Sequence, residues 1–340
     1  MVWAACSAAD AYAANDRTTQ IGWELRYKCC FPSNLLRLSL HETRRRAIME
    51  CMTIFCYAVA LVAILWTALS LLPAGAESHM PLPYMIALTP FLWIPLIAIS
   101  AYGVATHDWA LTVISCATAI SASSRRLSYW GKAWTTTNVA AVSVRRETSR
   151  ETTTFPLRAM TLNCRYGRAN AEDIVRQVRE RGIDVLALQE LSNDLVRRLD
   201  DAGLRDSLPY RQCGEAKDSD NGGFNAVFSR IRPVSMSPRA VEIPAADVPF
   251  IMLPLEDGRT LMVVSAHPKS PMRGCAAWSK GIRGLGAMAN GSFTGDRGIV
   301  AVMGDLNSSI EHPSFRALLR NGFQDASLIQ GKGPNLTFPR

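Results

Sequence analysis

The feature that most constrains this chain is a long stretch without any charged residue, from Cys51 to Ala76, which reads CMTIFCYAVALVAILWTALSLLPAGA. A helix that spans a bilayer needs about 20 consecutive apolar residues, and this run exceeds that length. A second uncharged run, Pro81 to Thr106, contains several prolines, which membrane helices tolerate. A third, Trp109 to Ser124, has about 16 residues and needs its flanks to span. We therefore predict a transmembrane region of two to three helices over residues 49–124.

Positive charges beside these runs bear on membrane orientation. Arg44–Arg46 precede the first run, which favours a cytoplasmic N-terminus, and we interpret residues 1–48 as a poorly ordered cytoplasmic tail. Three spans would place the rest of the chain outside the cytoplasm, whereas two would place it inside, as Arg125–Arg126 favour. The residues leave this choice open. Two further interpretations are an initiator at Met49 and a signal peptide ending at Ala74–Ala76, which the second apolar run disfavours because it would still anchor the chain.

Charge and cysteine content narrow the function of the remainder. The formal net charge is +8, yet residues 151–340 carry 24 Lys and Arg against 21 Asp and Glu, so a strong electrostatic footprint for nucleic acid is absent. The nine cysteines include no CxxC pair, which makes a structural zinc site improbable. Cys213 and Cys275 would be candidates for a disulfide in an oxidising compartment, and the sequence leaves that pairing open.

The pattern changes after a polar segment, residues 125–155, which contains RRETSRETTT and is predicted to be a linker. Strand-like and helix-like segments then follow one another, and the absence of GxGxxG together with consecutive strands in the middle favours an α/β sandwich over a Rossmann sheet. The predicted strands are 157–164, 183–190, 223–230, 260–268 and 298–307, and the predicted helices are 169–182, with Asn170 as its N-cap and Gly182 as its stop, 192–203 and about 276–290.

Polar residues stand where four of these strands end. Asn163, Glu190 and His267 each end one strand, and Asp305 and Asn307 follow the last, in IVAVMGDLNSS. Because strand ends carry chemistry in open sheets, we expect these residues to converge. Carboxylate and amide oxygens suit Mg²⁺, which binds through one or two carboxylates plus phosphate, and histidine exchanges protons near neutral pH. The set predicts metal-assisted attack of water on a phosphate ester.

The segments TLNCRYG, VLALQE, GFNAVFSR, SAHPKSP, GDLNSS and NLTFP occur in an order and spacing that resembles the endonuclease/exonuclease/phosphatase superfamily. The chain is especially similar to bacterial members in which several membrane spans precede the catalytic domain. The resemblance implies a four-layer α/β (α+β) sandwich, in which two packed mixed sheets are flanked by helices, over residues 156–340. It also implies an extracytoplasmic domain at a bacterial cell membrane, and so three spans.

The resemblance implies a role for each of these residues. Glu190 matches the metal-binding glutamate and Asn163 the asparagine beside the metal, which would be Mg²⁺, with Mn²⁺ as a substitute. His267 matches the histidine that contacts the scissile phosphate and serves as an acid. Asp305 and Asn307 match the pair that orients the attacking water and holds the phosphate. Ser229–Arg230 match a strand-end pair that supports the site.

One departure from the family pattern concerns the C-terminal end. The family continues past TFP to a strand with an Asp and a final Ser-Asp-His, whereas the sequence ends at Arg340 and offers only Asp325 and His312, both in the wrong context. We expect His312 to begin a helix instead. The resemblance thus implies an incomplete domain, and a catalytically inactive membrane-anchored binding or regulatory protein is the alternative to an enzyme.

Three further expectations concern partners. A transporter is disfavoured because the apolar runs hold no charge apart from the marginal Asp108. The substrate would be a phosphodiester or phosphomonoester, in nucleic acid or in a phospholipid head group. We expect a monomer that is integral to the membrane.

Overall fold

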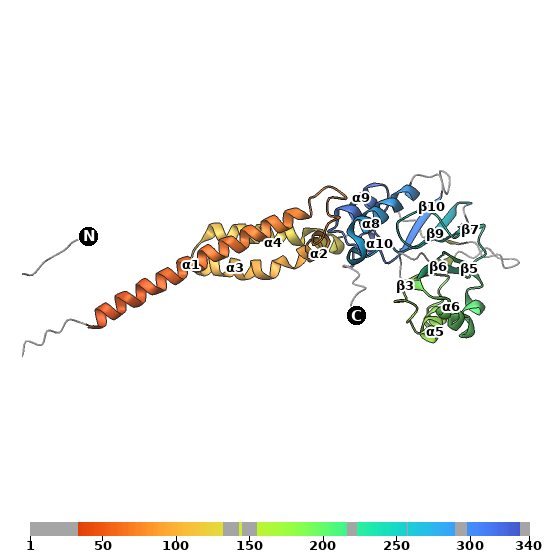
Figure 1. Cartoon of the computed structure of the whole chain (residues 1–340), viewed down its shortest axis with the longest axis horizontal. Coiled ribbons are helices and arrows are strands. Elements are labelled where there is room, and N and C mark those ends of the chain that lie inside the picture. The colour runs from red at the N-terminus through yellow and green to blue at the C-terminus, as the bar shows by residue number, and fades with distance from the viewer. Residues whose placement is uncertain are drawn as a thin grey trace, which may run out of the picture. The chain divides into compact units, whose positions relative to one another are not determined.

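The computed structural model describes residues 33–131, 143–144, 155–215, 223–256, 258–289 and 298–333. Its first part is helical (Figure 1). The helices are α1 (Ser33–Leu69), α2 (Leu82–Leu88), η1 (Thr89–Leu92), α3 (Trp93–Ala105), α4 (Trp109–Leu127) and η2 (Ser128–Trp130). Two stretches, Glu42–Leu69 and Leu82–Ala105, are long and apolar enough to cross a membrane, which weakly indicates membrane association.

Helices extend past two of the predicted domain boundaries. Residues 33–48 belong to α1 and are not an irregular tail, because the leucines and arginines of this segment favour helix and extend the apolar helix towards the N-terminus. Residues 125–130 belong to α4 and η2 and not to the linker, since Arg125 and Arg126 form the last turn of α4, where positive charge is favourable. The segment 145–154 lies outside the described residues.

The helical region has a small core and wide apolar outer faces. Ala60, Ile99 and Leu111 are buried together between the helices. In contrast, Ile54 on α1 is 69% exposed and Val113 on α4 is 65% exposed. Many bulky apolar side chains of this region thus face outward, a pattern that is typical of helices in lipid.

Residues from 155 onward form two four-stranded mixed sheets (Figure 1). The first has the order β3-β4-β6-β5 and the second β10-β9-β8-β7, and β3 with β4 and β9 with β10 are the parallel pairs. The strands are β3 (Ala159–Asn163), β4 (Val185–Leu191), β5 (Tyr210–Cys213), β6 (Phe224–Ser229), β7 (Ser235–Ser237), β8 (Phe250–Pro254), β9 (Thr260–Ala266) and β10 (Ile299–Gly304). A separate two-stranded ladder pairs β1 (Ser143–Val144) with β2 (Phe155–Pro156).

The period of two along each strand divides the core into three apolar layers. On β4, Leu186 and Leu188 face an outer layer beneath α5 (Ala171–Arg181) and α6 (Asn193–Asp201), whereas Val185 faces the layer between the sheets. On β9, Val263 faces the same central layer, and Val264 faces the second outer layer, under α8 (Pro271–Gly284) and α9 (Pro313–Arg320). The order helix, sheet, sheet, helix confirms the predicted four-layer sandwich preceded by a helical region.

Local signals set the helix ends as expected. Asn170 caps α5 by accepting a hydrogen bond from the Asp173 N–H, and Gly182 ends it in the left-handed conformation. Ser192 caps α6 in the same way. His312 is the residue before α9, as predicted, and Asp325 caps α10 (Ala326–Gln330). Two shorter elements complete the domain, α7 (Leu204–Ser207) and η4 (Leu285–Ala289).

Candidate active site

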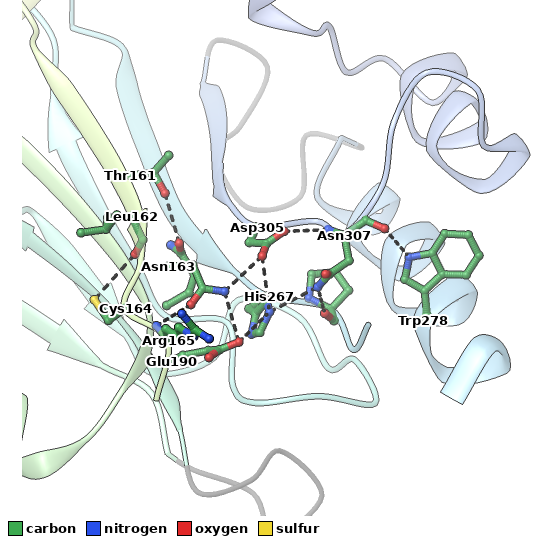
Figure 2. A network of polar contacts seen from close by, with 12 residues as sticks. Thr161, Leu162, Asn163, Cys164, Arg165, Glu190, His267, Trp278, Asp305 and Asn307 are labelled. Carbon is green, nitrogen blue, oxygen red and sulfur yellow. Dashed lines mark hydrogen bonds and ion pairs between the residues drawn. The ribbon is translucent and has the colours of Figure 1, made fainter. Parts of the chain in front are cut away.

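The topology brings the predicted polar residues to one place. Because β3 and β4 run parallel, Asn163 and Glu190 leave their sheet at the same edge. Because β9 and β10 run parallel, His267 and Asp305 leave the other sheet at the same edge. The two sheets pack face to face through the central apolar layer, and these two edges adjoin (Figure 2).

The end of β4 departs from regular strand geometry at Glu190. Its φ is +53°, and the register between β4 and β6 shifts between Leu188 and Leu191. Gly223 lies so close that an added Cβ would approach the Glu190 Cα to 3.1 Å. The bulge turns the carboxylate away from the sheet and towards the other residues of the site. A non-glycine residue with positive φ is costly and recurs at functional sites.

A strained turn after β3 supplies backbone donors to the site. Arg165, Tyr166 and Gly167 all have positive φ. The Arg165 N–H donates to Asn163 Oδ1 at 2.9 Å, and the Tyr166 N–H donates to Glu190 Oε2 at 3.0 Å. The Gly167 N–H donates to the Glu190 carbonyl at 2.8 Å. Consecutive N–H groups of this kind form a concavity that favours negative charge, and here they orient the Glu190 side chain.

Asn163 joins the two carboxylates. Its Nδ2 donates to Glu190 Oε1 and to Asp305 Oδ2, each at 3.1 Å (Figure 2). Since both oxygens face the same nitrogen, they lie less than twice that distance apart. Two carboxylates so close repel each other unless a cation or proton lies near them. The amide therefore orients both groups around a common point.

The GDLN segment bends sharply because of its first and last residues. Gly304 has a φ of +150° and packs against the backbone of Ala266 on the neighbouring strand, where no side chain fits. Asn307 has a φ of +49°, a conformation that asparagine tolerates better than most residues. The Asn307 N–H donates to Asp305 Oδ1 at 2.9 Å. This turn directs the Asp305 carboxylate and the Asn307 amide to the same side.

His267 lies between the amide and the carboxylates. Its Nε2 is 3.3 Å from Asn307 Nδ2, 3.6 Å from Glu190 Oε1 and 4.0 Å from Asp305 Oδ2. Asn307 Nδ2 also donates to the Pro268 carbonyl at 3.1 Å, which holds the amide in place. A neutral Nε2 would accept from Asn307, and a protonated one would face two carboxylates. The ring is thus positioned to exchange a proton in either state.

A buried polar contact joins the sheets directly beneath the site. Gln189 Nε2 donates to Ser265 Oγ at 2.9 Å, and that hydroxyl donates to the Leu188 carbonyl at 3.0 Å. Thr161 Oγ1 donates to Gln189 Oε1 at 3.3 Å. Gln189 and Ser265 are almost fully buried, and each stands within two residues of Glu190 or His267. Directional bonds here fix the position of one sheet edge against the other.

A cavity of about 490 Å³ opens beside these residues. Glu190, His267 and Asn307 contribute to its wall. Further lining residues were not singled out from the sequence: Tyr166, Gly223, Asn225, Ala246, Lys269, Ser270, Met272 and Arg273. The guanidinium of Arg273 stands 5.2 Å from the centroid of the Tyr166 ring. Lys269 and Arg273 give the wall positive charge, which suits an anionic ligand.

The chemistry of the donor set fits a divalent cation. Within the described residues no group of three or more His, Cys, Asp and Glu side chains forms a cage of protein ligands. Magnesium does not require one, because it binds through one or two carboxylates and keeps several waters. Glu190 and Asp305 present two such carboxylates to one point. Asn163 turns its nitrogen towards them, so in this arrangement it positions the carboxylates, and its Oδ1 accepts from Arg165.

Residues outside this cluster have structural roles. Ser229 and Arg230 lie at the far end of the first sheet, because Ser229 pairs with Val185, the first residue of β4. Arg230 Nη2 donates to the Ile183 carbonyl, so the pair braces the start of β4 and not the site itself. Cys213 and Cys275 are free thiols, so the disulfide considered from the sequence is not formed in this structure. Cys275 Sγ donates to the Pro271 carbonyl within α8.

The sequence pattern of the Endonuclease/Exonuclease/phosphatase family matches residues 160–340, more than half of the chain. The chain belongs to this family. Members of the endonuclease/exonuclease/phosphatase family are hydrolases that act on phosphate esters. Comparison with curated protein sequences gives no match. The matched range includes the GDLN, QE and HPKSP segments, which carry the converging side chains.

Three solved structures are similar to part of this chain. Sphingomyelinase C from Streptomyces griseocarneus is 20% identical, with 49% of this chain and 69% of that chain covered and a TM-score of 0.39. A beta toxin mutant from Staphylococcus aureus with bound magnesium ions is 15% identical, with 48% and 69% covered and a TM-score of 0.38. A family protein from Bacteroides vulgatus is 16% identical, with 49% and 72% covered and a TM-score of 0.39.

Proposed function

We propose that this protein is a membrane-anchored, divalent-metal-dependent phosphoesterase that hydrolyses a phosphodiester or phosphomonoester with an activated water. The observation that carries the proposal is the convergence of Glu190 and Asp305 on the amide of Asn163, beside His267 and Asn307. These five side chains come from four strand ends. Their spacing brings hard oxygen ligands, a proton-exchanging ring and an amide within reach of one phosphate group.

Glu190 would hold the cation, with Asn163 beside it and Asp305 facing it, and Mg²⁺ or Mn²⁺ is the expected ion. When bound, such a cation stabilises the negative charge that develops on the phosphate. Two features of the protein support this role. The Tyr166 N–H fixes the Glu190 carboxylate and the Gly167 N–H fixes its backbone carbonyl. The negative charge of the two neighbouring carboxylates is one that a cation would neutralise.

The remaining residues would handle the phosphate and the water. Asp305 would accept a hydrogen bond from the attacking water and orient it in line with the ester bond. His267, protonated at Nε2, would contact a phosphate oxygen and give that proton to the leaving group, and Asp305 would take the proton that the attacking water loses. Asn307 would hold another phosphate oxygen at the cavity wall. Lys269 and Arg273 would bind the rest of the anionic substrate, as their place in the lining supports.

Membrane anchoring rests on the helical region. Its outward faces carry large apolar side chains, among them Leu65, which is 60% exposed, and Ile120, which is 65% exposed. Two stretches have the length and hydropathy of membrane spans. With α4 as a third span and a cytoplasmic N-terminus, the catalytic domain would face the extracytoplasmic side of a bacterial membrane. A phospholipid head group or a nucleic acid would be the phosphate ester.

The test uses the full chain in detergent micelles with Mg²⁺ or Mn²⁺ and bis(p-nitrophenyl) phosphate, followed by DNA and by phospholipid vesicles. We expect hydrolysis that EDTA abolishes. Glu190→Gln and Asp305→Asn should each lower kcat/KM at least about 100-fold, and His267→Gln about 100-fold. Asp206→Asn is the matched carboxylate control, because its side chain is 80% exposed and outside the cluster, and it should keep the wild-type rate.

Two outcomes would contradict the proposal. Hydrolysis that survives Glu190→Gln and Asp305→Asn would place the chemistry elsewhere. A wild-type chain that binds Mn²⁺ and phosphate but turns over neither ester nor lipid would favour the binding protein on the same fold.

A further inference from the structure

The segment that follows the GDLN turn is bound to the helical region by buried polar groups. The Ser314 N–H donates to Glu77 at 2.6 Å, and Arg126 Nε pairs with Glu311 at 3.0 Å. A third contact joins Arg316 to the Ser70 carbonyl. Glu77 and Glu311 are at most 1% exposed. Buried carboxylates are costly without partners, and directional bonds of this kind define one orientation where apolar packing would allow several.

His312 lies in the middle of this segment and has both ring nitrogens engaged. The Ser309 N–H donates to Nδ1 at 3.0 Å, so Nδ1 carries no proton and Nε2 must carry it. Nε2 then donates to the carbonyl of Pro83, in α2, at 3.0 Å. The ring is 3% exposed. One bond of His312 is therefore local to its own turn, and the other reaches the helical region.

The ring also contacts the residue that holds the catalytic turn. Its centroid is 5.1 Å from that of Trp278, and the planes meet at 78°, an edge-to-face contact. Trp278 is fully buried on α8, and its Nε1 donates to the carbonyl of Asn307 at 3.0 Å (Figure 2). Asn307 in turn contacts His267. A continuous series of contacts thus runs from Pro83 to the candidate catalytic histidine.

We propose that His312 is a positioning residue, which uses its bond to Pro83 to hold Trp278 and, through it, the Asn307 carbonyl. The helical region then helps to hold the geometry of the active site, in addition to anchoring the chain. Asn307 needs such support because its backbone has positive φ, a strained conformation for a residue other than glycine. The predicted loss of hydrolysis in His312 variants rests on the proposed function, whereas the predicted change in hydrogen exchange does not.

Two substitutions separate the two bonds of His312. In His312→Asn, the amide oxygen can replace Nδ1 as acceptor for the Ser309 N–H, but the side chain is too short to reach Pro83. In His312→Gln, the amide nitrogen can replace Nε2 as donor to Pro83, while the acceptor for Ser309 is lost. The proposal predicts that the Gln variant resembles the wild type and that the Asn variant does not.

The measurement is hydrogen–deuterium exchange of the full chain in detergent micelles, together with kcat and KM on bis(p-nitrophenyl) phosphate. His312→Asn should raise exchange at least about fivefold in the peptide that covers residues 303–308, and leave peptides of β4 and β6 unchanged. Its kcat should fall about tenfold with KM within twofold, because misplacement of reacting groups affects the chemical step more than binding. His312→Gln should stay within about threefold of wild type in both measurements.

A second variant protects the test against a failure of His312→Asn to fold. Trp278→Phe keeps an aromatic ring beside His312 but removes the donor to Asn307, and it should raise exchange in the same peptide. Unchanged exchange at 303–308 in both variants would overturn the proposal. So would a Gln variant that is as perturbed as the Asn variant, since the local bond alone would then matter. If the wild type shows no hydrolysis, the proposed function fails, while the exchange result still decides this inference.

Discussion

Replacement of Gly304 by alanine tests how the GDLN turn is built. An added Cβ would lie 2.9 Å from the carbonyl carbon of Ala266 and closer still to its oxygen, and both atoms are backbone of the adjacent strand β9. The φ of +150° adds strain of about 1 to 3 kcal/mol for any residue with a Cβ. Separation of β9 from β10 at this pair would weaken one or two ladder hydrogen bonds, at about 1 kcal/mol each. We expect Gly304→Ala to lower the free energy of unfolding by about 4 kcal/mol.

Gly258→Ala is the control for this substitution. Gly258 also has positive φ, +80°, but an added Cβ there would meet no atom within 4 Å. It should cost only the conformational strain, about 1 to 2 kcal/mol, and leave hydrolysis unchanged. Guanidinium unfolding in micelles, followed by tryptophan fluorescence, measures both. Equal losses in the two variants would refute the clash, and a Gly304→Ala protein with full activity would refute the claim that this turn places Asp305.

Three further predictions follow from buried groups. Gln189→Ala should lower the free energy of unfolding by about 2 to 3 kcal/mol in the same assay, because Ser265 Oγ loses one of its two partners across the sheets and Thr161 Oγ1 loses its acceptor. Adding Ser265→Ala should then cost less than Ser265→Ala costs in the wild type. Burial lowers the pKa of His312 from 6.5, so below pH 6.5 the unfolded chain binds a proton that the folded chain does not. The free energy of unfolding should therefore fall by up to about 1.4 kcal/mol for each pH unit below 6.5. His312→Gln should flatten that slope. Burial raises the pKa of Cys164 to about 12, so iodoacetamide at pH 8 should label it only after unfolding, as mass spectrometry of its peptide would report.

The sandwich could be predicted because its main strands are strongly apolar, and β4, β6 and β9 are buried on both faces. The runs at β4, β6, β9 and β10 are nearly all apolar, and the capping residues Asn170, Ser192 and Gly182 mark helix ends by purely local chemistry. The strands β5 and β7 gave no such signal. Tyr210–Cys213 is a short edge strand with half-buried residues, and Ser235–Ser237 has mixed polarity, so only pairing with a neighbour makes them strands.

The five candidate site residues were found because each follows an apolar strand, and parallel pairing then brings them together. Their supports could not be found in that way. The bond between Gln189 and Ser265 joins positions far apart in sequence, and either residue alone is unremarkable. The contact of Arg273 with Tyr166 depends on where α8 begins relative to the turn after β3. Such contacts depend on how the sheets and helices pack, so the local sequence around either residue does not predict them.

The most direct test of a cation site at the converged strand ends is a titration of the full chain with Mn²⁺, in which electron paramagnetic resonance measures the bound and free ion. We expect one bound Mn²⁺ per chain, which excess Mg²⁺ displaces. Its affinity should be at least about tenfold weaker in Glu190→Gln and unchanged in Asp206→Asn. Stoichiometric Mn²⁺ binding that is the same in wild type and in Glu190→Gln, or no binding by the wild type, would contradict it.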